Sequence, residues 1–351
     1  MENKTKQEPI KSKFGAKTTA QEIADKYDLS GKNVIITGGY SGVGLEITKA
    51  LAEAGAKLLV PVRNFSKAQA ALKNIPNVEI DTLDLMNPES IDAFAERFLA
   101  TGKPLHILIN DAGIMAPPLK RDSRGYESQL STNHLGHFQL TARLWPALVK
   151  SGDARVVAVS SRAQRLGGVN FDDPNYFKSE YVPMKAYAQS KTANVLFATE
   201  LDRLGIAYGI RAFAAHPGLV PSTNLGSSAL EGKAPGIGRS ITKAAYSFIR
   251  NLPVNSLINT LKKFKPHHVG DEFKSMEQGA ATPLWCAISD ELNAMGGVYC
   301  EDCNIAFAVT DNTSPFGVLP WAIDPEKAAR LWSLSEELTG VKFSPKTSSS
   351  I

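Results

Sequence analysis

A glycine-rich stretch near the start of the chain limits the possible folds more than any other part of the sequence. The apolar run Val-Ile-Ile at 34–36 is followed by the pattern Thr-Gly-x-x-x-Gly-x-Gly at 37–44 and by Leu45-Glu46. This order predicts a buried strand, a tight turn and a helix. A helix N-terminus presents free N–H groups and a positive dipole end to an anion. The stretch predicts a phosphate-binding turn, although a βα turn without a ligand stays an alternative for this segment alone.

The composition excludes several classes of protein. Of the 351 residues 43% are hydrophobic and 21% charged, with a net charge of +4, which is typical of a soluble globular protein. The small charge, without basic clusters interleaved with aromatics, argues against nucleic acid as a partner. There is no apolar run long enough to span a membrane, and we expect no secretory signal. Three cysteines are too few for a disulfide framework, so we expect a reducing, cytoplasmic location.

Two of these cysteines, Cys300 and Cys303, form a C-x-x-C motif. A structural zinc ion needs about four ligands, and no second ligand pair follows. We therefore expect ordinary packing rather than zinc or redox chemistry, and predict no metal site.

Strands and helices alternate along the chain. Because the expected strands are apolar throughout, they predict a parallel sheet covered on both faces, of the α/β doubly wound class. Expected strands are 32–37, 57–62, 78–83, 106–110, 155–160, 210–215 and 297–300; expected helices are 19–27, 45–54, 66–73, one from Pro88, 126–149, 187–204 and 277–289.

The expected organisation is one domain at 31–310, without internal repeats. A polar N-terminal extension at 1–30 begins with a Lys-rich, mobile leader, and a C-terminal extension covers 311–351. Residues 226–272 interrupt the pattern, and a long insertion of this kind predicts a substrate lid. Its amphipathic and basic part at 241–265 leaves weak peripheral contact with a membrane as an alternative.

A tyrosine and a lysine one helical turn apart supply candidate proton chemistry. Tyr187 and Lys191 stand at i and i+4 and share a helix face. A nearby ammonium favours the phenolate, so we expect a lowered pKa for Tyr187 and proton exchange with a carbonyl or alcohol oxygen. The hydroxyl of Ser160 or Ser161, at the end of a neighbouring strand, would hold that oxygen.

Together these elements resemble the short-chain dehydrogenase/reductase family. The resemblance rests on the glycine turn, Asn-Asp-Ala-Gly at 110–113, Asn133, Ser161, Tyr187/Lys191 and Pro217-Gly218, and runs from about Lys32 to Cys303. The phrases Asn-Asp-Ala-Gly-Ile-Met-Ala-Pro-Pro, Thr-Asn-His-Leu-Gly-His-Phe and Ser-Lys-Thr-Ala-Asn-Val-Leu-Phe are most similar to its retinol-dehydrogenase-like and protochlorophyllide-reductase-like branch. The resemblance implies a Rossmann-type sheet.

The resemblance also implies roles for individual residues. Tyr187 would be the general acid–base, Lys191 would hold the nicotinamide ribose, and Ser161, with Ser160 as the alternative, would hold the substrate oxygen. Asn133 would complete the catalytic set through its backbone carbonyl. The implied cofactor residues are Thr37, Gly38, Tyr40, Ser41, Gly42, Val43, Gly44, Arg63, Asp84, Leu85, Asn110, Ala112, Gly113, Tyr187, Lys191, Pro217, Gly218 and Thr223.

One departure from the family pattern is Asp111, where the family commonly has asparagine. It puts only the fine geometry of that loop in question. His134, His137 and His216 are expected to be structural, since the family needs no metal.

Charge predicts the cofactor. A 2′-hydroxyl prefers an acid at the end of the second strand, and a 2′-phosphate prefers an arginine. Arg63 stands there, and the next acids along the chain, Glu79 and Asp81, belong to the third expected strand, so NADP(H) is the expected cofactor.

The expected function is NADP(H)-dependent hydride transfer between nicotinamide and a carbonyl or secondary alcohol, in the direction of ketone or aldehyde reduction. Loops 162–186 and 226–272 bring apolar and aromatic side chains, among them Phe171, Tyr176, Phe177 and Tyr181 beside Arg165, and predict an apolar or aromatic substrate. Alternatives are an alcohol dehydrogenase working in the oxidative direction, an enone reductase, or a non-enzymatic dinucleotide-sensing protein. A homo-oligomer is expected through the Asn133 and Tyr187 helices, unless the insertion or the C-terminal extension blocks that face and leaves a monomer.

Overall fold

One eight-stranded sheet organises the residues that this computed structural model describes, 5–222, 273–311 and 316–343. Its order is β3-β2-β1-β4-β5-β6-β7-β8, parallel except for the last pair. This confirms the doubly wound α/β class. The strands are β1 (Asn33–Thr37), β2 (Lys57–Val62), β3 (Val78–Thr82), β4 (Ile107–Asn110), β5 (Ala154–Val159), β6 (Ile210–His216), β7 (Val298–Glu301) and β8 (Asn304–Ile305).

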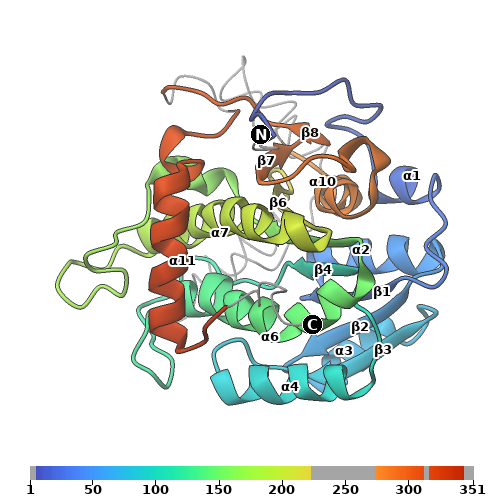
Figure 1. The fold of residues 1–351 in the computed structure, drawn as a ribbon, viewed down its shortest axis with the longest axis horizontal. Helices are drawn as coiled ribbons and strands as arrows, with labels where there is room; N and C mark the ends of the chain where they lie inside the picture. The colour runs from blue at the N-terminus through green and yellow to red at the C-terminus, as the bar shows by residue number, and fades with distance from the viewer. Residues whose placement is uncertain (1–4, 223–272, 312–315, 344–351) are drawn as a thin grey trace, which may run out of the picture.

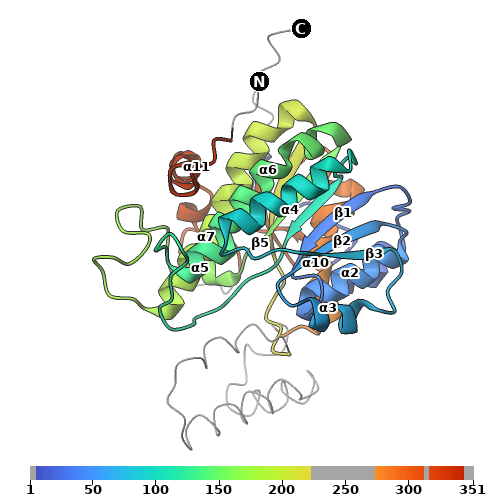
Figure 2. The same cartoon turned by 90° about the horizontal axis from the view of Figure 1, so that it is seen from below.

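Two hydrophobic cores, one on each face, hold helices against the sheet (Figure 2). Adjacent residues of β1 separate the cores, since Ile36 belongs to one and Ile35 to the other, as the two-residue period of a strand requires. One face carries α1 (Ala20–Ala24), α2 (Gly42–Glu53), α3 (Phe65–Leu72) and α10 (Met276–Ile288), and the other carries α4 (Pro88–Ala100), α6 (Gly136–Ser151) and α7 (Pro183–Gly205).

Several helices begin and end at local signals. Asn87 accepts hydrogen bonds from two N–H groups at the start of α4, with Pro88 as its first residue, and Ser275 forms a capping box with Gln278 at the start of α10. Pro183 likewise opens α7, four residues before the start expected from the Tyr-x-x-x-Lys motif.

The helix expected at 126–149 is not regular. It begins with α5 (Ser128–Leu130), passes through a π-helical turn, η1 (Ser131–Leu135), and continues as α6. Such turns occur often at functional sites, and this one carries Asn133.

The described part of the N-terminal leader, which the sequence predicts to be mobile, makes defined contacts with the sheet. The side chain of Gln7 donates to the carbonyl oxygens of Tyr299 and Ala306, at 2.8 and 2.7 Å, and accepts from the N–H of Tyr299 at 2.9 Å. These bonds fix the leader to the edge formed by β7 and β8.

The C-terminal residues contribute a further helix, α11 (Pro325–Thr339), which lies across α7 (Figure 1). Its Trp332 is 5.0 Å from Phe138 of α6 and stacks at 5.9 Å on Phe197 of α7, as measured between ring centres. The region expected only as an extension therefore completes one of the two cores.

The predicted lid at 226–272, its part at 241–265, and Thr223 lie outside the described residues. Within the described ranges, no helix combines the length and apolar character needed to cross a bilayer.

Candidate active site

A cavity of about 610 Å³ opens at the carboxyl ends of the parallel strands. Most of the residues implied as catalytic or cofactor-binding line it: Thr37, Gly38, Tyr40, Ser41, Gly42, Val43, Arg63, Asp84, Leu85, Ala112, Gly113, Ser161, Tyr187, Lys191, Pro217 and Gly218. Gly44, Asn110 and Asn133 stand behind this wall rather than in it.

The glycine turn forms one wall by pressing its backbone against the loop after β4. Gly38 has φ +74°, and a Cβ there would lie 3.0 Å from the Cα of Ala112. A Cβ on Gly44 would lie 2.5 Å from Oδ2 of Asp111 and 2.6 Å from the carbonyl oxygen of Gly38. Only glycine fits both positions. The turn and the N-terminus of α2 thus fit a pyrophosphate, which needs close approach of the backbone.

Thr37 joins the glycine turn to the loop after β4. Its hydroxyl accepts hydrogen bonds from the N–H groups of Asp111 and Ala112, at 3.0 and 3.1 Å. Asn110 points away from the cavity and donates to the hydroxyl of Thr141 at 3.2 Å. Asn110 therefore supports the loop from behind.

The charges at the ends of β2 and β3 fit a 2′-phosphate. Arg63 is exposed at the cavity rim, directly after β2. Asp81, near the end of β3, is bound at 2.9 and 3.0 Å by the guanidinium of Arg97. An engaged Asp81 is a poor acceptor for a ribose hydroxyl, whereas Arg63 has the geometry that phosphate prefers.

On the opposite wall, α7 presents Tyr187 and Lys191. The ammonium of Lys191 donates to the carbonyl of Val159 at 2.9 Å and lies 5.7 Å from the ring centre of Tyr187. Both serine candidates line the cavity, but Ser160 is buried and donates its hydroxyl proton to the carbonyl of Lys191 at 2.7 Å. Ser161 accepts from the N–H of Ala163 at 3.1 Å, and its hydroxyl hydrogen-bonds Tyr187.

Burial controls the ionisation of this pair. It raises the pKa of Tyr187 to about 12, against the lowering effect of the Ser161 hydrogen bond. It also lowers the pKa of Lys191 to about 8, against the raising effect of the Asp111 carboxylate. The expected lowering of the Tyr187 pKa is therefore wrong for this structure, because burial outweighs the Ser161 hydrogen bond and the Asp111 carboxylate acts in the same direction as burial.

Asp111, the departure from the family pattern, lines the cavity and carries its carboxylate against the glycine turn. Burial raises its pKa to about 6, and Lys191 opposes the shift. The sequence marked this position as unusual but did not predict that the side chain would face both the turn and the lysine.

Asn133 sits in the π turn and is fully buried. Its side-chain oxygen accepts from the N–H of Ile114 at 2.9 Å, and its amide donates to the Ile114 carbonyl at 3.0 Å and to the hydroxyl of Ser190 at 2.9 Å. Asn133 therefore fixes Ile114, a lining residue, to helix α7.

The loop 162–186, expected to form the substrate wall, does not line the cavity between Arg162 and Ala186. Arg165 instead bonds the carbonyls of Phe316 and Gly317, at 2.8 and 3.0 Å. Phe177 is exposed beneath the guanidinium of Arg121, and the same guanidinium donates to the carbonyl of Tyr176. These side chains hold the loop to its neighbours and leave the cavity to other residues.

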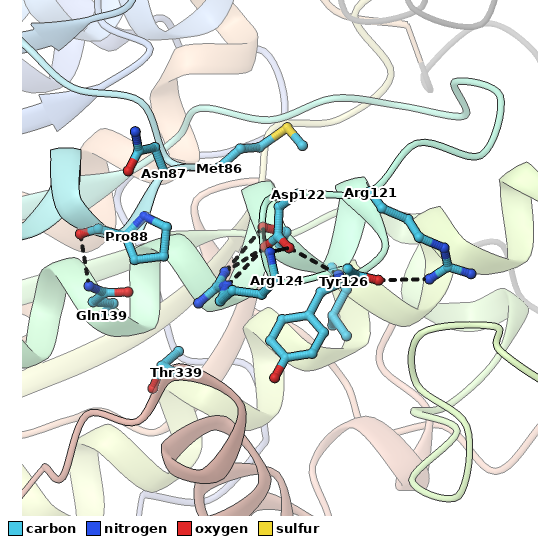
Figure 3. Close-up of polar contacts among 12 residues, drawn as sticks. Met86, Asn87, Pro88, Arg121, Asp122, Arg124, Tyr126, Gln139 and Thr339 are labelled. Atoms are coloured by element: carbon cyan, nitrogen blue, oxygen red, sulfur yellow. Dashed lines mark hydrogen bonds and ion pairs between the residues drawn. The ribbon is translucent and has the colours of Figure 1, made fainter.

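A network of polar contacts holds the segment 121–126 beside this loop (Figure 3). Asp122 accepts from the guanidinium of Arg124 at 2.7 Å and from the N–H of Tyr126 at 2.9 Å, and Arg121 donates to the carbonyl of Gly125. Gln129 connects the same region to the site: it accepts from the N–H of Ala116 and donates to Tyr181 and Pro183.

Part of the lining, most of it apolar, is not predicted from the sequence. These residues adjoin recognised motifs, and their position in the chain was the available signal: Pro61, Val62, Leu83, Ile114, Met115, Thr132, Val159, Leu219, Val220, Pro221 and Phe273. Among the described residues, no three His, Cys, Asp or Glu side chains gather in a way that could hold a metal ion.

Comparison with known proteins agrees with this geometry. Residues 32–234 match the family model described as short chain dehydrogenase. The chain is 36% identical to retinol dehydrogenase 12 of Mus musculus, over 90% of this chain and 88% of that protein. It is 35% identical to the WW domain-containing oxidoreductase of Gallus gallus, over 94% and 73%.

Solved structures show the same fold. A Mycobacterium paratuberculosis protein superposes with a TM-score of 0.66 and 33% identity, covering 93% of this chain and 99% of that one. A gluconate 5-dehydrogenase of Burkholderia cenocepacia superposes with a TM-score of 0.57 and 19% identity, over 79% and 96%.

Proposed function

The chain belongs to the short-chain dehydrogenase family and is an oxidoreductase, and from this premise we propose that it uses NADP(H) to reduce an apolar or aromatic ketone or aldehyde. The observation that carries the proposal is the convergence of Ser161, Tyr187 and Lys191 on the cavity that the glycine turn also lines.

The residues divide the work on the carbonyl group. Ser161 holds the substrate oxygen, and Tyr187 delivers a proton to it as the alcohol forms. Lys191 binds the cofactor ribose and keeps positive charge near the phenol. When bound, the nicotinamide supplies the hydride that the carbonyl carbon receives. Ser161 is preferred to Ser160, because the hydroxyl of Ser160 is engaged with Lys191.

The ionisation of Tyr187 supports the reductive direction. With its pKa at about 12, Tyr187 stays protonated at neutral pH, which is the form that donates a proton to a carbonyl oxygen. Oxidation of an alcohol needs the phenolate, and burial disfavours that form.

The lining and the charges support the cofactor and the substrate class. Arg63 binds the 2′-phosphate, since Asp81 is engaged by Arg97. Ile114, Met115 and Phe273 give part of the cavity an apolar surface. One relative is named for retinol, which agrees with an apolar substrate.

The test is NADPH oxidation with a panel of ketones, aldehydes, enones and alcohols, for wild type and Tyr187→Phe. We expect turnover with apolar carbonyl compounds and a fall in kcat of about 10³-fold in Tyr187→Phe. The Kd for NADPH should stay within about twofold, because the phenol oxygen is the only atom removed. Turnover that the substitution does not change would reject the mechanism. Activity confined to enones, or to alcohols with NADP⁺, would reject the proposed substrate.

We also propose that the chain is a monomer in a reducing, cytoplasmic compartment. Helix α11 covers the face of α6 and α7 through which relatives would associate, and all three cysteines are buried thiols. Light scattering coupled to size-exclusion chromatography tests the oligomeric state: a mass near 38 kDa is expected from the 37.8 kDa chain.

A further inference from the structure

Two histidines on one turn of the long helix have the same burial and different partners. His134 and His137 are 1% and 2% exposed. His134 bonds the hydroxyl of Ser335 in α11 through Nε2 at 2.7 Å. His137 bonds the carbonyl oxygen of Asn133 through Nδ1 at 3.1 Å and the hydroxyl of Thr37 through Nε2 at 2.9 Å. Only His137 reaches the residues of the site.

The partners fix the tautomer of His137. A carbonyl oxygen only accepts, so Nδ1 carries the proton and donates it to Asn133. Thr37 accepts from the N–H groups of Asp111 and Ala112, which occupy both lone pairs of its hydroxyl. The hydroxyl proton of Thr37 has two acceptors within reach, Nε2 of His137 at 2.9 Å and the carbonyl oxygen of Ile109 at 3.5 Å, and the shorter contact assigns the proton to Nε2. Every donor and acceptor in this group is satisfied only by the neutral Nδ1–H imidazole.

The ionisation of His137 agrees with its bonding. Burial lowers its pKa to about 4, with Lys191 acting in the same direction and the Asn133 bond opposing it. A charged ring would bring a proton on Nε2 against a hydroxyl that has no free lone pair. The imidazole therefore stays neutral across the physiological pH range.

His137 also completes a path of contacts across the site, which consists of hydrogen bonds except where it passes through the covalent bonds of Asn133. The hydroxyl of Thr37 donates to His137, and His137 donates to the carbonyl of Asn133. The side chain of Asn133 then donates to Ser190 at 2.9 Å, and Ser190 donates to the carbonyl of Tyr187 at 2.8 Å. The path runs from the end of β1, where the glycine turn begins, to the helix turn that carries the phenol.

We propose that His137 is a positioning residue, whose neutral imidazole couples the glycine turn to Asn133 and through it to the Tyr187 helix. The inference rests on the proposed function, because it assigns the glycine turn to NADP(H) and Tyr187 to proton transfer. One ring nitrogen holds the cofactor side and the other holds the catalytic side.

Two conservative substitutions test the hydrogen bonds of the two ring nitrogens separately. His137→Asn keeps a donor close to Nδ1 and loses the acceptor for Thr37, so we expect the Kd for NADPH to rise about tenfold and kcat to fall less than about threefold. His137→Gln keeps an acceptor close to Nε2 and loses the donor for Asn133. For this variant we expect kcat to fall about tenfold and the Kd to change less than about threefold.

His134 offers a matched control. His134→Phe and His137→Phe remove the same group at the same depth on one helix turn, so both should lower the melting temperature. Only His137→Phe should also raise the Kd and lower kcat, each by about tenfold, while His134→Phe leaves both within about twofold. Equal effects on kcat and Kd in the two variants, or no split between His137→Asn and His137→Gln, would overturn the proposal.

The tautomer gives a readout that needs neither cofactor nor turnover. The hydroxyl of Ser335 already donates to the carbonyl of Leu331 at 2.7 Å, so His134 must donate through Nε2. Nitrogen-15 spectra of histidine-labelled protein should show the Nδ1–H form for His137 and the Nε2–H form for His134. The substitutions assign the signals among the six histidines. An Nε2–H form at His137 would refute the geometry.

The two proposals fail in different ways. Wild type that binds NADPH but reduces no carbonyl compound would reject the proposed function, while the Kd comparison and the spectra would still decide the role of His137. Wild type that is active but insensitive at His137 would reject only the positioning role.

Discussion

The two sides of the cavity are built by different means. On the cofactor side, the glycine turn meets the loop after β4 backbone against backbone, with Cβ positions on Gly38 and Gly44 already occupied. On the other side, side chains bridge segments far apart in the sequence, as Gln129 does between Ala116 and Pro183. A surface made of backbone demands particular residue types at fixed spacing, whereas a surface held by side-chain bridges can use many pairs. The backbone surface can therefore be predicted from a sequence, whereas the surface held by side-chain bridges cannot.

The largest expected effect comes from filling the backbone contact. Gly44→Ala places a Cβ 2.6 Å from the carbonyl oxygen of Gly38, a backbone atom, and 2.5 Å from Oδ2 of Asp111, so the turn itself must change shape. We expect the Kd for NADPH to rise at least about 100-fold, measured by fluorescence titration. Gly15→Ala is the control, since a Cβ there has open space around it. An unchanged Kd in Gly44→Ala would show that the turn tolerates a side chain.

A smaller effect should follow loss of the charge at the end of β2. Arg63→Ala should raise the Kd for NADPH about 30-fold and leave the Kd for NADH within about twofold, because only NADPH carries the 2′-phosphate. Lys73→Ala, an exposed cation at the end of the next helix, should change neither. Equal or tighter binding of NADH by wild type would refute the cofactor assignment.

On the cofactor side, where the contact is otherwise made by backbone, Asp111 contributes a charged side chain. Its pKa is raised to about 6 in the folded protein, so between about pH 4 and pH 6 the folded state holds a proton that the unfolded state has lost. As the pH rises through this window, the free energy of unfolding of wild type should fall by about 2 kcal/mol relative to that of Asp111→Asn, which cannot titrate.

Urea unfolding of wild type and Asp111→Asn at pH 4, 5, 6 and 7 measures this difference. A constant offset between the two proteins at all four values would show that the carboxylate is not destabilised by burial.

The smallest expected effect is on the side of the cavity that side-chain bridges hold in place. Gln129→Ala removes the bonds to Ala116 and Pro183 behind the lining, so the KM for the carbonyl substrate should rise about fivefold while the Kd for NADPH stays within about twofold. Gln139→Ala is the control: Gln139 of α6 is also buried, and it instead bonds the Pro88 carbonyl at 3.1 Å (Figure 3) and the carboxylate of Asp92 at 2.7 Å. A rise in the Kd of Gln129→Ala for NADPH would show that the two sides of the cavity do not act independently.

The strands and the cofactor side could be predicted because their signals are local. Apolar runs mark β1 and β4, and the residues after each strand fall at one edge of a parallel sheet. The ionisation of Tyr187 could not be predicted, because it depends on burial by elements distant in sequence.

The C-terminal helix carried a signal that was not used. Asp324 and Pro325 are a helix-start pair, and Ala328, Leu331 and Trp332 follow at helical spacing. The loop 162–186 was misassigned for the opposite reason. Its aromatic residues suggest a binding wall, but their partners, such as Arg121 for Phe177, are visible only in three dimensions.

The hydrogen bonds of Gln7 bear on the tendency of the protein to aggregate through the edge of its sheet. Strand β8 covers β7 with only two residues, and an incompletely covered strand can recruit a strand from a second molecule. The amide of Gln7 occupies the N–H and the carbonyl of Tyr299 as a neighbouring strand would. The leader thus blocks strand pairing between molecules at this edge. A chain shortened to begin after Gln7 would keep its catalytic groups but become prone to precipitate.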